Sequence, residues 1–414
     1  MHIAHFTNTY HPVISGVVRS VSTFRQALAE LGHNVFIFAQ YSSGHEDPEP
    51  FVFRYPAIDI PFTHNFPVAI PISPFVDRLL PSLKLDVIHS HHPFLLGRVA
   101  AIKAQELNLP LVFTFHTRYR EYSHYISLNQ QLVKDAIDLW IGEYMQHCHH
   151  IVVPSDSIKQ LLAEVYGVTN QVTAIPTGIN LGPYQAADGR RIRQERGWSQ
   201  DKVLISIGRL AKEKNWDTLL AAMAQVIEKH RDVRLVIIGE GDERRALSKY
   251  ARKLGIAERV EFTGKIPFAD VPSYLKAADL FCFASITETQ GLVTMEALAA
   301  ELPVVAVEAT GTSDVIEHGR QGLLTDNDSD ALAQAILQVL ADEALWQRFK
   351  EAAAARAKEF DMLRQAEKLV AVYHQAIEDQ QADRLVRVDK QKQIFQMIID
   401  EEQWQKWLGL EKES

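Results

Sequence analysis

The sequence predicts an α/β protein with two doubly wound parallel sheets. Two observations support this. Short apolar runs typical of buried strands alternate with segments of helical periodicity along most of the chain, and the alternation pauses at a polar, basic stretch at 188–200 before resuming at Val203. A chain of 414 residues with 47% hydrophobic side chains can form two cores. We therefore expect domains at residues 1–185 and 186–361, with the linker near 188–200.

The first domain is predicted to open with a parallel strand–helix–strand unit. Ile3–Phe6 and residues 34–39 are the expected strands, and the helix between them stops at Gly32. Gly16 lies at the start of this helix, where the missing side chain lets a phosphate or a sugar approach backbone amides. The same glycine is also consistent with a simple strand-to-helix turn.

Residues 42–81 break the alternation with eight prolines among aromatic side chains. We expect an irregular excursion here, which either shapes an acceptor site or packs on the domain.

Two later strands lead into histidine-rich loops. They are predicted at 86–90 and 111–115, and His116 follows the second directly. Because ligands gather outside the carboxyl ends of parallel strands, His116 is well placed for chemistry. The group His89, His91 and His92 lacks the i, i+4 pair with an adjacent carboxylate that is typical of zinc sites, so we expect no metal.

The second domain is predicted to have strands at 203–207, 234–239, 260–264, 280–283 and 303–307. Gly208 ends the first of them, and Arg209 and Lys214 follow. Two such cations can neutralise a diphosphate without a metal, although they are also explained as ordinary surface charges. The turn at 239–242 lacks the third glycine of a dinucleotide fingerprint, so no nicotinamide cofactor is expected.

The stretch 285–300 carries two carboxylates eight positions apart, Glu288 in a loop and Glu296 in a helix that is expected to start near Gly291. Unpaired amides and the positive dipole at a helix N-terminus suit a phosphate. Carboxylates suit sugar hydroxyls instead, so the combination predicts a pocket for a nucleotide sugar. A loop followed by a surface helix with solvated glutamates is the alternative.

Composition excludes several classes of protein. The net charge is −9, and residues 1–200 carry 15 Lys and Arg against 16 Asp and Glu, so nucleic acid is not an expected partner. Cys148 and Cys282 are far apart and cannot form a disulfide framework, which favours a reducing cytoplasm. No run of 18 apolar residues predicts a membrane span.

The sequence resembles the retaining GT-B glycosyltransferases of family GT4 over about residues 1–375. The resemblance rests on the order of four features along the chain: the Gly16 loop, His116, Gly208-Arg209 with Lys214, and the Glu288–Glu296 stretch. This resemblance implies two Rossmann-like domains facing across a cleft, a C-terminal helix at about 362–380 that crosses back to the first domain, and hexose transfer from a nucleotide sugar without a metal. It implies that Arg209 and Lys214 bind the diphosphate. Donor-binding residues would be Gly16, Gly208, Arg209, Lys214, Glu288, Gln290, Gly291, Leu292 and Glu296, and catalytic residues His116, Glu288, Arg209 and Lys214.

Within that family, Glu288–Leu292 and Phe115-His116-Thr117 with the tyrosines that follow resemble the bacterial diacylglycerol glucosyltransferases. The resemblance implies UDP-glucose as donor, a diacylglycerol acceptor and peripheral binding to an anionic membrane. Acceptor contacts would come from Arg118, Tyr119, Tyr122 and Tyr125. The near-neutral first 200 residues depart from the basic face expected of such enzymes. A soluble sugar or polysaccharide acceptor therefore stays open, as does a sugar-nucleotide epimerase or binding protein.

The tail, residues 381–414, lies beyond the resemblance. Apolar residues including Leu385, Val388, Trp404 and Trp407 predict an amphipathic helix with charges of both signs on its polar face. Packing or homodimerisation is the expected use, since a membrane helix would be more basic.

Overall fold

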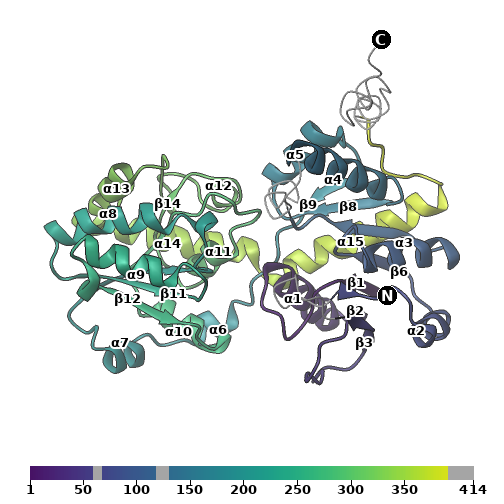
Figure 1. Cartoon of the computed structure of the whole chain (residues 1–414), viewed down its shortest axis with the longest axis horizontal. Helices are drawn as coiled ribbons and strands as arrows, with labels where there is room; N and C mark the ends of the chain where they lie inside the picture. The colour runs from purple at the N-terminus through teal and green to yellow at the C-terminus, as the bar shows by residue number, and fades with distance from the viewer. Residues whose placement is uncertain (59–67, 118–129, 390–414) are drawn as a thin grey trace, which may run out of the picture. The chain divides into compact units, whose positions relative to one another are not determined.

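The structure, a computed structural model, describes residues 1–58, 68–117 and 130–389. These residues form two compact units. Unit 1 comprises Met1–Ile175 and the described residues from Ala366 onward, and unit 2 comprises Pro176–Gln365. In Figure 1, colour follows the chain, and the yellow-green helix α15 carries it back into unit 1.

Seven parallel strands form the sheet of unit 1, in the order β3-β2-β1-β6-β7-β8-β9. They are β1 (His2–Thr7), β2 (Asn34–Gln40), β3 (Val52–Tyr55), β6 (Val87–Ser90), β7 (Leu111–Thr114), β8 (His150–Val153) and β9 (Val172–Ala174). The helices are α1 (Gly16–Glu30), α2 (Pro74–Leu79), α3 (Leu96–Glu106), α4 (Gln130–Met145), α5 (Asp156–Tyr166) and α15 (Met362–Gln381), which begins at the end of unit 2.

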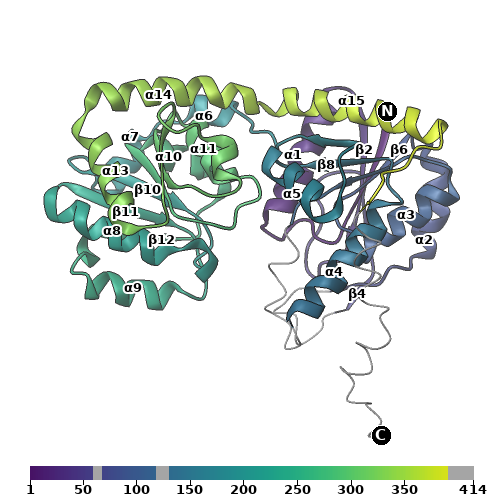
Figure 2. The same cartoon turned by 90° about the horizontal axis from the view of Figure 1, so that it is seen from above.

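Alternate residues of the central strands face opposite sides of this sheet, as a pleat requires. Phe6 and Ile88 join the apolar core formed with α3 and α4. His5 and His89 are neighbours in register and face the other way, where both contact Tyr373 of α15. Figure 2 shows α15 along one face of the sheet, with α3 and α4 beyond the opposite face.

The proline-rich excursion is more ordered than expected. Its described part contains the edge strand β3, a two-stranded antiparallel pair of β4 (Ala57–Ile58) and β5 (Val68–Ala69), and α2. Pro74 is the first residue of α2, where the missing backbone N–H is not needed, and no proline lies within β3, β4 or β5.

Six parallel strands form the sheet of unit 2, in the order β12-β11-β10-β13-β14-β15. They are β10 (Lys202–Ile207), β11 (Val233–Ile238), β12 (Val260–Gly264), β13 (Leu280–Phe283), β14 (Val304–Val307) and β15 (Gly322–Thr325). The helices are α6 (Gly182–Ala186), α7 (Arg190–Arg196), α8 (Trp216–Lys229), α9 (Arg244–Lys253), α10 (Val271–Lys276), α11 (Leu292–Ala299), α12 (Thr312–Val315), α13 (Ser329–Ala341) and α14 (Glu343–Ala357).

Each face of this second sheet has its own core. Residues of α8, α9 and α13 pack on one face, and residues of α10, α11 and α14 pack on the other. Short 3₁₀ helices complete the fold at η1 (Leu80–Leu83), η3 (Lys212–Lys214), η4 (Ala257–Arg259), η5 (Phe268–Asp270) and η6 (Lys358–Phe360).

The linker predicted at 188–200 is wrong, because this stretch lies inside unit 2 and contains α7. Its cations have local partners: Arg193 pairs with Asp279 at 2.7 Å and also donates to the Ala277 carbonyl. Trp198 is fully buried. Polar composition alone therefore did not distinguish a linker from a short surface helix anchored by one buried aromatic side chain.

The predicted amphipathic helix of the tail is also wrong for its described residues. The helix α15 ends at Gln381, and Asp383 has a left-handed φ of 52°. Val386 then lies in a segment without regular secondary structure, where its N–H donates to the Cys148 carbonyl and its side chain is buried. Residues 390–414 lie outside the described part of the chain. Across the described residues, none of the helices has the length and apolarity needed to cross a bilayer.

Candidate active site

Unit 2 places its predicted donor residues at the carboxyl ends of adjacent strands. Gly208 follows β10 and Glu288 follows β13, and these strands pair where the winding of the sheet reverses. Open α/β sheets bind ligands at this switch point. The fold thus brings the Arg209–Lys214 segment and Glu288 together at the position where a nucleotide ligand is expected.

Lys214 and Glu288 form an ion pair. Glu288 Oε1 accepts hydrogen bonds from Lys214 Nζ at 2.5 Å and from Ser285 Oγ at 2.8 Å. Only 20% of the lysine side chain and 16% of the glutamate side chain are exposed. An ammonium has three donors and a carboxylate a second oxygen, so the pair can hold itself in place and still bind a ligand.

Arg209 is held less firmly. Its guanidinium pairs with Glu213 four residues later, and 57% of its side chain is exposed. The Arg209 carbonyl, in contrast, accepts a hydrogen bond from Trp216 Nε1 at 3.0 Å. The backbone is therefore fixed while the cation can reorient toward an anion.

Glu296 and Gln290 are both buried. Tyr184 donates to Glu296 Oε1 at 3.2 Å, and the Glu296 residue is 1% exposed. The Gln290 amide donates to the Thr177 carbonyl at 3.0 Å. The structure therefore uses the Gln290 side chain to hold the 177 segment, and covers the carboxylate predicted to bind the ribose.

Two glycines bring the loops after β13 and β14 into contact. Gly291 caps α11 with a φ of 71°, as the predicted helix start requires, and Leu292 is the first residue of the helix. Gly311 has a φ of 80°, and a Cβ there would lie 2.8 Å from the Gln290 nitrogen and 2.9 Å from Glu288 Cβ. Only glycine fits this position without moving Glu288.

In unit 1, His116 lies in the loop after β7, as predicted, with its Nε2 2.9 Å from His91 Nδ1. Desolvation, with smaller effects of His92 and His5, lowers the pKa of His116 to about 3. The imidazole is therefore neutral at pH 7. Gly16 is the first residue of α1, and Ser15 caps that helix by accepting from the Val18 N–H at 3.2 Å.

Comparisons with known proteins identify the family. Residues 14–182 match the model described as Glycosyltransferase Family 4, and residues 188–356 match the model described as Glycosyl transferases group 1. The alpha-monoglucosyldiacylglycerol synthase of Streptococcus pneumoniae is 32% identical over 82% of this chain and 78% of its own length. The enzyme of the same name from Acholeplasma laidlawii is 31% identical over 81% and 87%.

The chain belongs to glycosyltransferase family 4. It is a hexosyltransferase with the GT-B fold, so the epimerase and binding-protein alternatives are not retained. Sucrose-phosphate synthase from Thermosynechococcus elongatus superposes with a TM-score of 0.74 over 91% of this chain and 99% of its own, at 22% identity. HepE of Anabaena, solved with UDP and glucose, gives 0.72 over 90% and 99%, at 20% identity. These two neighbours support the fold.

The acceptor residues predicted for the transferase, Arg118, Tyr119, Tyr122 and Tyr125, lie outside the described residues. They remain predictions, as do the roles assigned to the donor residues.

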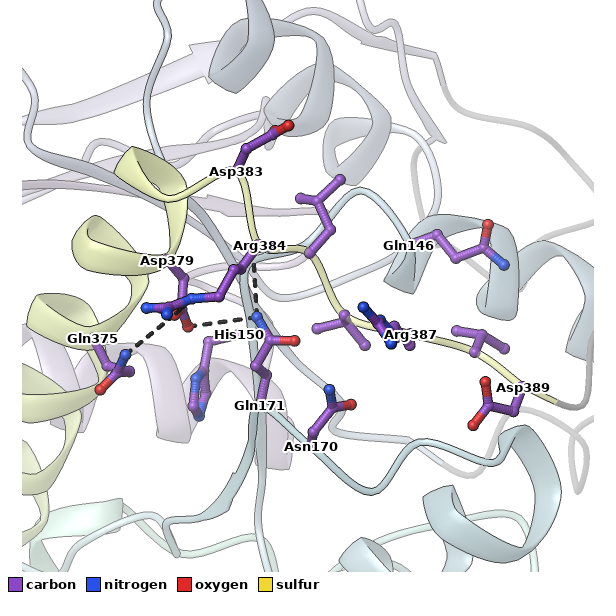
Figure 3. A pocket seen from close by; sticks show the side chains of 13 residues that line it. Gln146, His150, Asn170, Gln171, Gln375, Asp379, Asp383, Arg384, Arg387 and Asp389 are labelled. Carbon is purple, nitrogen blue, oxygen red and sulfur yellow. Dashed lines mark hydrogen bonds and ion pairs between the residues drawn. The ribbon is translucent and has the colours of Figure 1, made fainter.

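One cavity in the described part of the transferase contains none of the predicted site residues. It has a volume of about 790 Å³ and lies in unit 1, lined by the segment after α15 and by residues at the starts of β8 and β9, including His150 and Gln171 (Figure 3). Asp379 anchors this segment: its Oδ1 accepts from Arg384 Nε at 2.9 Å and from Gln375 at 3.1 Å. The side chains around the hollow therefore serve to dock the chain that leaves α15.

A group of buried polar residues beneath His116 was not predicted. The sequence places His89, His91 and His92 close together, whereas the structure joins His89 and His91 to His5 and separates His92, whose Nδ1 accepts from the Asn8 N–H. One nitrogen of each of His5, His89 and His91 lies within 4.8 Å of the others, close enough to consider a metal. The sequence carried one signal for this group: two of the predicted apolar strands each contain a histidine.

Proposed function

We propose that this transferase moves glucose from UDP-glucose to a lipid alcohol such as 1,2-diacylglycerol, with retention at the anomeric carbon. The observation that carries the proposal is the 31–32% identity, over about four fifths of the chain, to two enzymes named alpha-monoglucosyldiacylglycerol synthase. Both names specify an alpha glycoside, which supports retention when the donor is itself alpha-linked.

In this proposal, Arg209, Lys214 and the amides at Gly291 and Leu292 stabilise the charge that develops on the departing diphosphate. Lys214 lies within hydrogen-bonding distance of Glu288, so one ligand can contact both, with its phosphate at the cation and its sugar hydroxyls at the carboxylate. Glu296, which is buried against Tyr184 in this structure, becomes accessible to bind the ribose, and His116 contacts the hexose. Neutralisation by cations makes a metal unnecessary, so chelation with EDTA leaves the rate unchanged.

Exposed apolar side chains in unit 1 support contact with a lipid surface. Ile58, Ile72 and Phe75 are 57%, 67% and 63% exposed and belong to the proline-rich excursion. Large exposed apolar groups close together in sequence are typical of interaction sites.

The second candidate acceptor is a soluble sugar or polysaccharide. The near-neutral charge of residues 1–200 favours it, because a membrane-binding enzyme of this kind is expected to have a basic face.

The decisive experiment measures nucleoside diphosphate release from UDP-, GDP- and ADP-sugars, with and without diacylglycerol in mixed micelles. Lipid-dependent UDP release from UDP-glucose that disappears in Glu288→Ala supports the proposal, and the anomeric proton coupling of the product reports retention or inversion. Release that depends on a soluble sugar instead transfers the assignment to the second candidate.

Membrane contact has its own test. Phe75→Ser is expected to reduce sedimentation with anionic vesicles, whereas Phe268→Ser, an equally exposed phenylalanine of unit 2, serves as the matched control. A lipid-facing role for the excursion is contradicted if both variants lose vesicle binding to the same extent. It is also contradicted if the parent protein does not bind the vesicles.

A further inference from the structure

Unit 1 contains a continuous chain of hydrogen-bonding side chains that ends at His116. Five successive contacts join β1, β6, β7 and α15 with the loops after β6 and β7. In order, the chain runs Thr114, His89, Tyr373, His5, His91 and His116. The donor–acceptor distances are 2.6, 2.7, 3.2, 3.0 and 2.9 Å along this series.

The side chains inside this hydrogen-bonded series are shielded from solvent. His5, His89 and His91 are at most 1% exposed, and Tyr373 is fully buried. Desolvation by burial lowers the pKa of His5 to about 3 and holds the pKa values of His89 and His91 well below the usual range. All three imidazoles are therefore neutral, and each carries one N–H and one lone pair.

A neutral imidazole that donates at one nitrogen must accept at the other, so the direction of one hydrogen bond fixes the direction of the next. If Thr114 donates to His89, then His89 donates to Tyr373, Tyr373 to His5, and His5 to His91. His91 Nδ1 then donates to His116 Nε2, and the proton of His116 is on Nδ1.

The reverse direction leaves a proton without an acceptor. His89 would donate to Thr114, whose hydroxyl has no hydrogen-bond partner other than His89 among the described residues. If Tyr373 instead accepted from both histidines, its own buried hydroxyl proton would be unpaired. Because an unpaired buried donor is costly, the direction that starts at Thr114 is favoured.

We infer that Thr114 and Tyr373 are positioning residues that fix the tautomer of His116, so that its Nδ1 presents an N–H to an oxygen of the donor hexose. This inference rests on the proposed function for the identity of the ligand. A protonated Nδ1 binds a hydroxyl oxygen as a donor and cannot take a proton from the acceptor alcohol, which leaves that task to another group.

Nitrogen-15 NMR of the histidine-labelled full chain, without substrate, tests the inference, with the His116→Gln spectrum assigning the resonances. The parent is expected to show Nδ1 protonated and Nε2 unprotonated in His116. Thr114→Val and Tyr373→Phe each remove one hydroxyl, so the form of His116 protonated on Nε2 appears in both. Thr173→Val is the control. It breaks a similar threonine–histidine contact, between Thr173 and His150 at 2.9 Å, that does not belong to the hydrogen-bonded series, so it leaves His116 unchanged.

A parent His116 protonated on Nε2 overturns the inference, as does a His116 spectrum that neither variant changes. Either variant alone suffices if the other fails to fold. Stoichiometric zinc in the purified parent also overturns it, because an ion at His5, His89 and His91 would take the lone pairs that the hydrogen-bonded series needs.

Turnover of the two variants with the donor should fall in proportion to the loss of the His116 tautomer protonated on Nδ1, roughly 2- to 10-fold. Since the spectra need no substrate, this inference can fail while the transferase assignment stands, and the reverse also holds.

Discussion

The Lys214 ammonium lies 2.5 Å from the Glu288 carboxylate at the edge of the unit 2 sheet, and both side chains are largely shielded from water. The pair holds a cation for the diphosphate and a carboxylate for the sugar in one place. Lys214→Met is expected to lower kcat/KM for the nucleotide sugar by about 100- to 1000-fold, as loss of a preorganised charge-stabilising donor does.

The control for this change is Lys276→Met. Lys276 has similar exposure and pairs with Glu301 at 3.2 Å in the same unit, away from the switch point. Steady-state kinetics of the two variants should separate them clearly. A comparable loss in both would show that the effect of Lys214→Met is one of stability rather than of donor binding.

Glu296→Gln keeps the shape of the side chain that accepts from Tyr184 but removes its charge. If the carboxylate binds the ribose, loss of charge-assisted hydrogen bonds should weaken nucleoside diphosphate binding by about 10- to 100-fold. Isothermal titration calorimetry measures this. Glu301→Gln, just beyond the same helix and with 42% of its side chain exposed, should leave the affinity unchanged, and an unchanged affinity in Glu296→Gln would refute the assigned role.

Gly311 and Gly319 allow strain and crowding to be separated. Both have a left-handed backbone, with φ of 80° and 79°, but a Cβ at Gly319 meets nothing within 4 Å. Gly319→Ala should cost about 1–2 kcal/mol of unfolding free energy, from the backbone alone. Gly311→Ala should cost more and also lower activity, because the new methyl group displaces Glu288. Urea denaturation with an activity assay checks both, and equal losses would contradict the crowding seen at Gly311.

Acid is expected to weaken unit 1. The pKa of buried His5 is lowered from 6.5 to about 3, so unfolding at lower pH is accompanied by proton uptake. The contribution of His5 to stability is fully present above pH 6.5 and is lost as the pH falls toward 3, at up to about 1.4 kcal/mol per pH unit. His89 and His91 shift in the same direction and add to this slope.

Melting temperatures between pH 7.5 and 4.5 report this slope. His5→Asn should flatten it, whereas replacement of the exposed His147 by Asn should not. A pH dependence that is identical in parent and His5→Asn would show that the buried histidines are not neutral in the folded state.

Much of the fold follows from local sequence. Apolar runs such as Leu280–Phe283 became buried strands with the predicted bounds, and Gly291 caps the helix that carries Glu296. Predictions of this kind succeed because strand burial and helix capping depend on neighbours within a few residues. The predicted carboxyl ends of the strands then indicate which polar side chains lie where ligands bind in parallel sheets.

What each side chain contacts at that edge depended on the tertiary structure. Lys214 meets Glu288 across 74 positions, and His5 meets Tyr373 across 368, because strand order and register bring them together. The sequence shows a histidine in an apolar strand, but no local pattern tells whether it faces a metal, a ligand or another histidine. Hydrophobic periodicity determined by itself that this chain forms two parallel sheets, whereas the long-range packing of α15 on the first sheet decided the partners of its buried histidines.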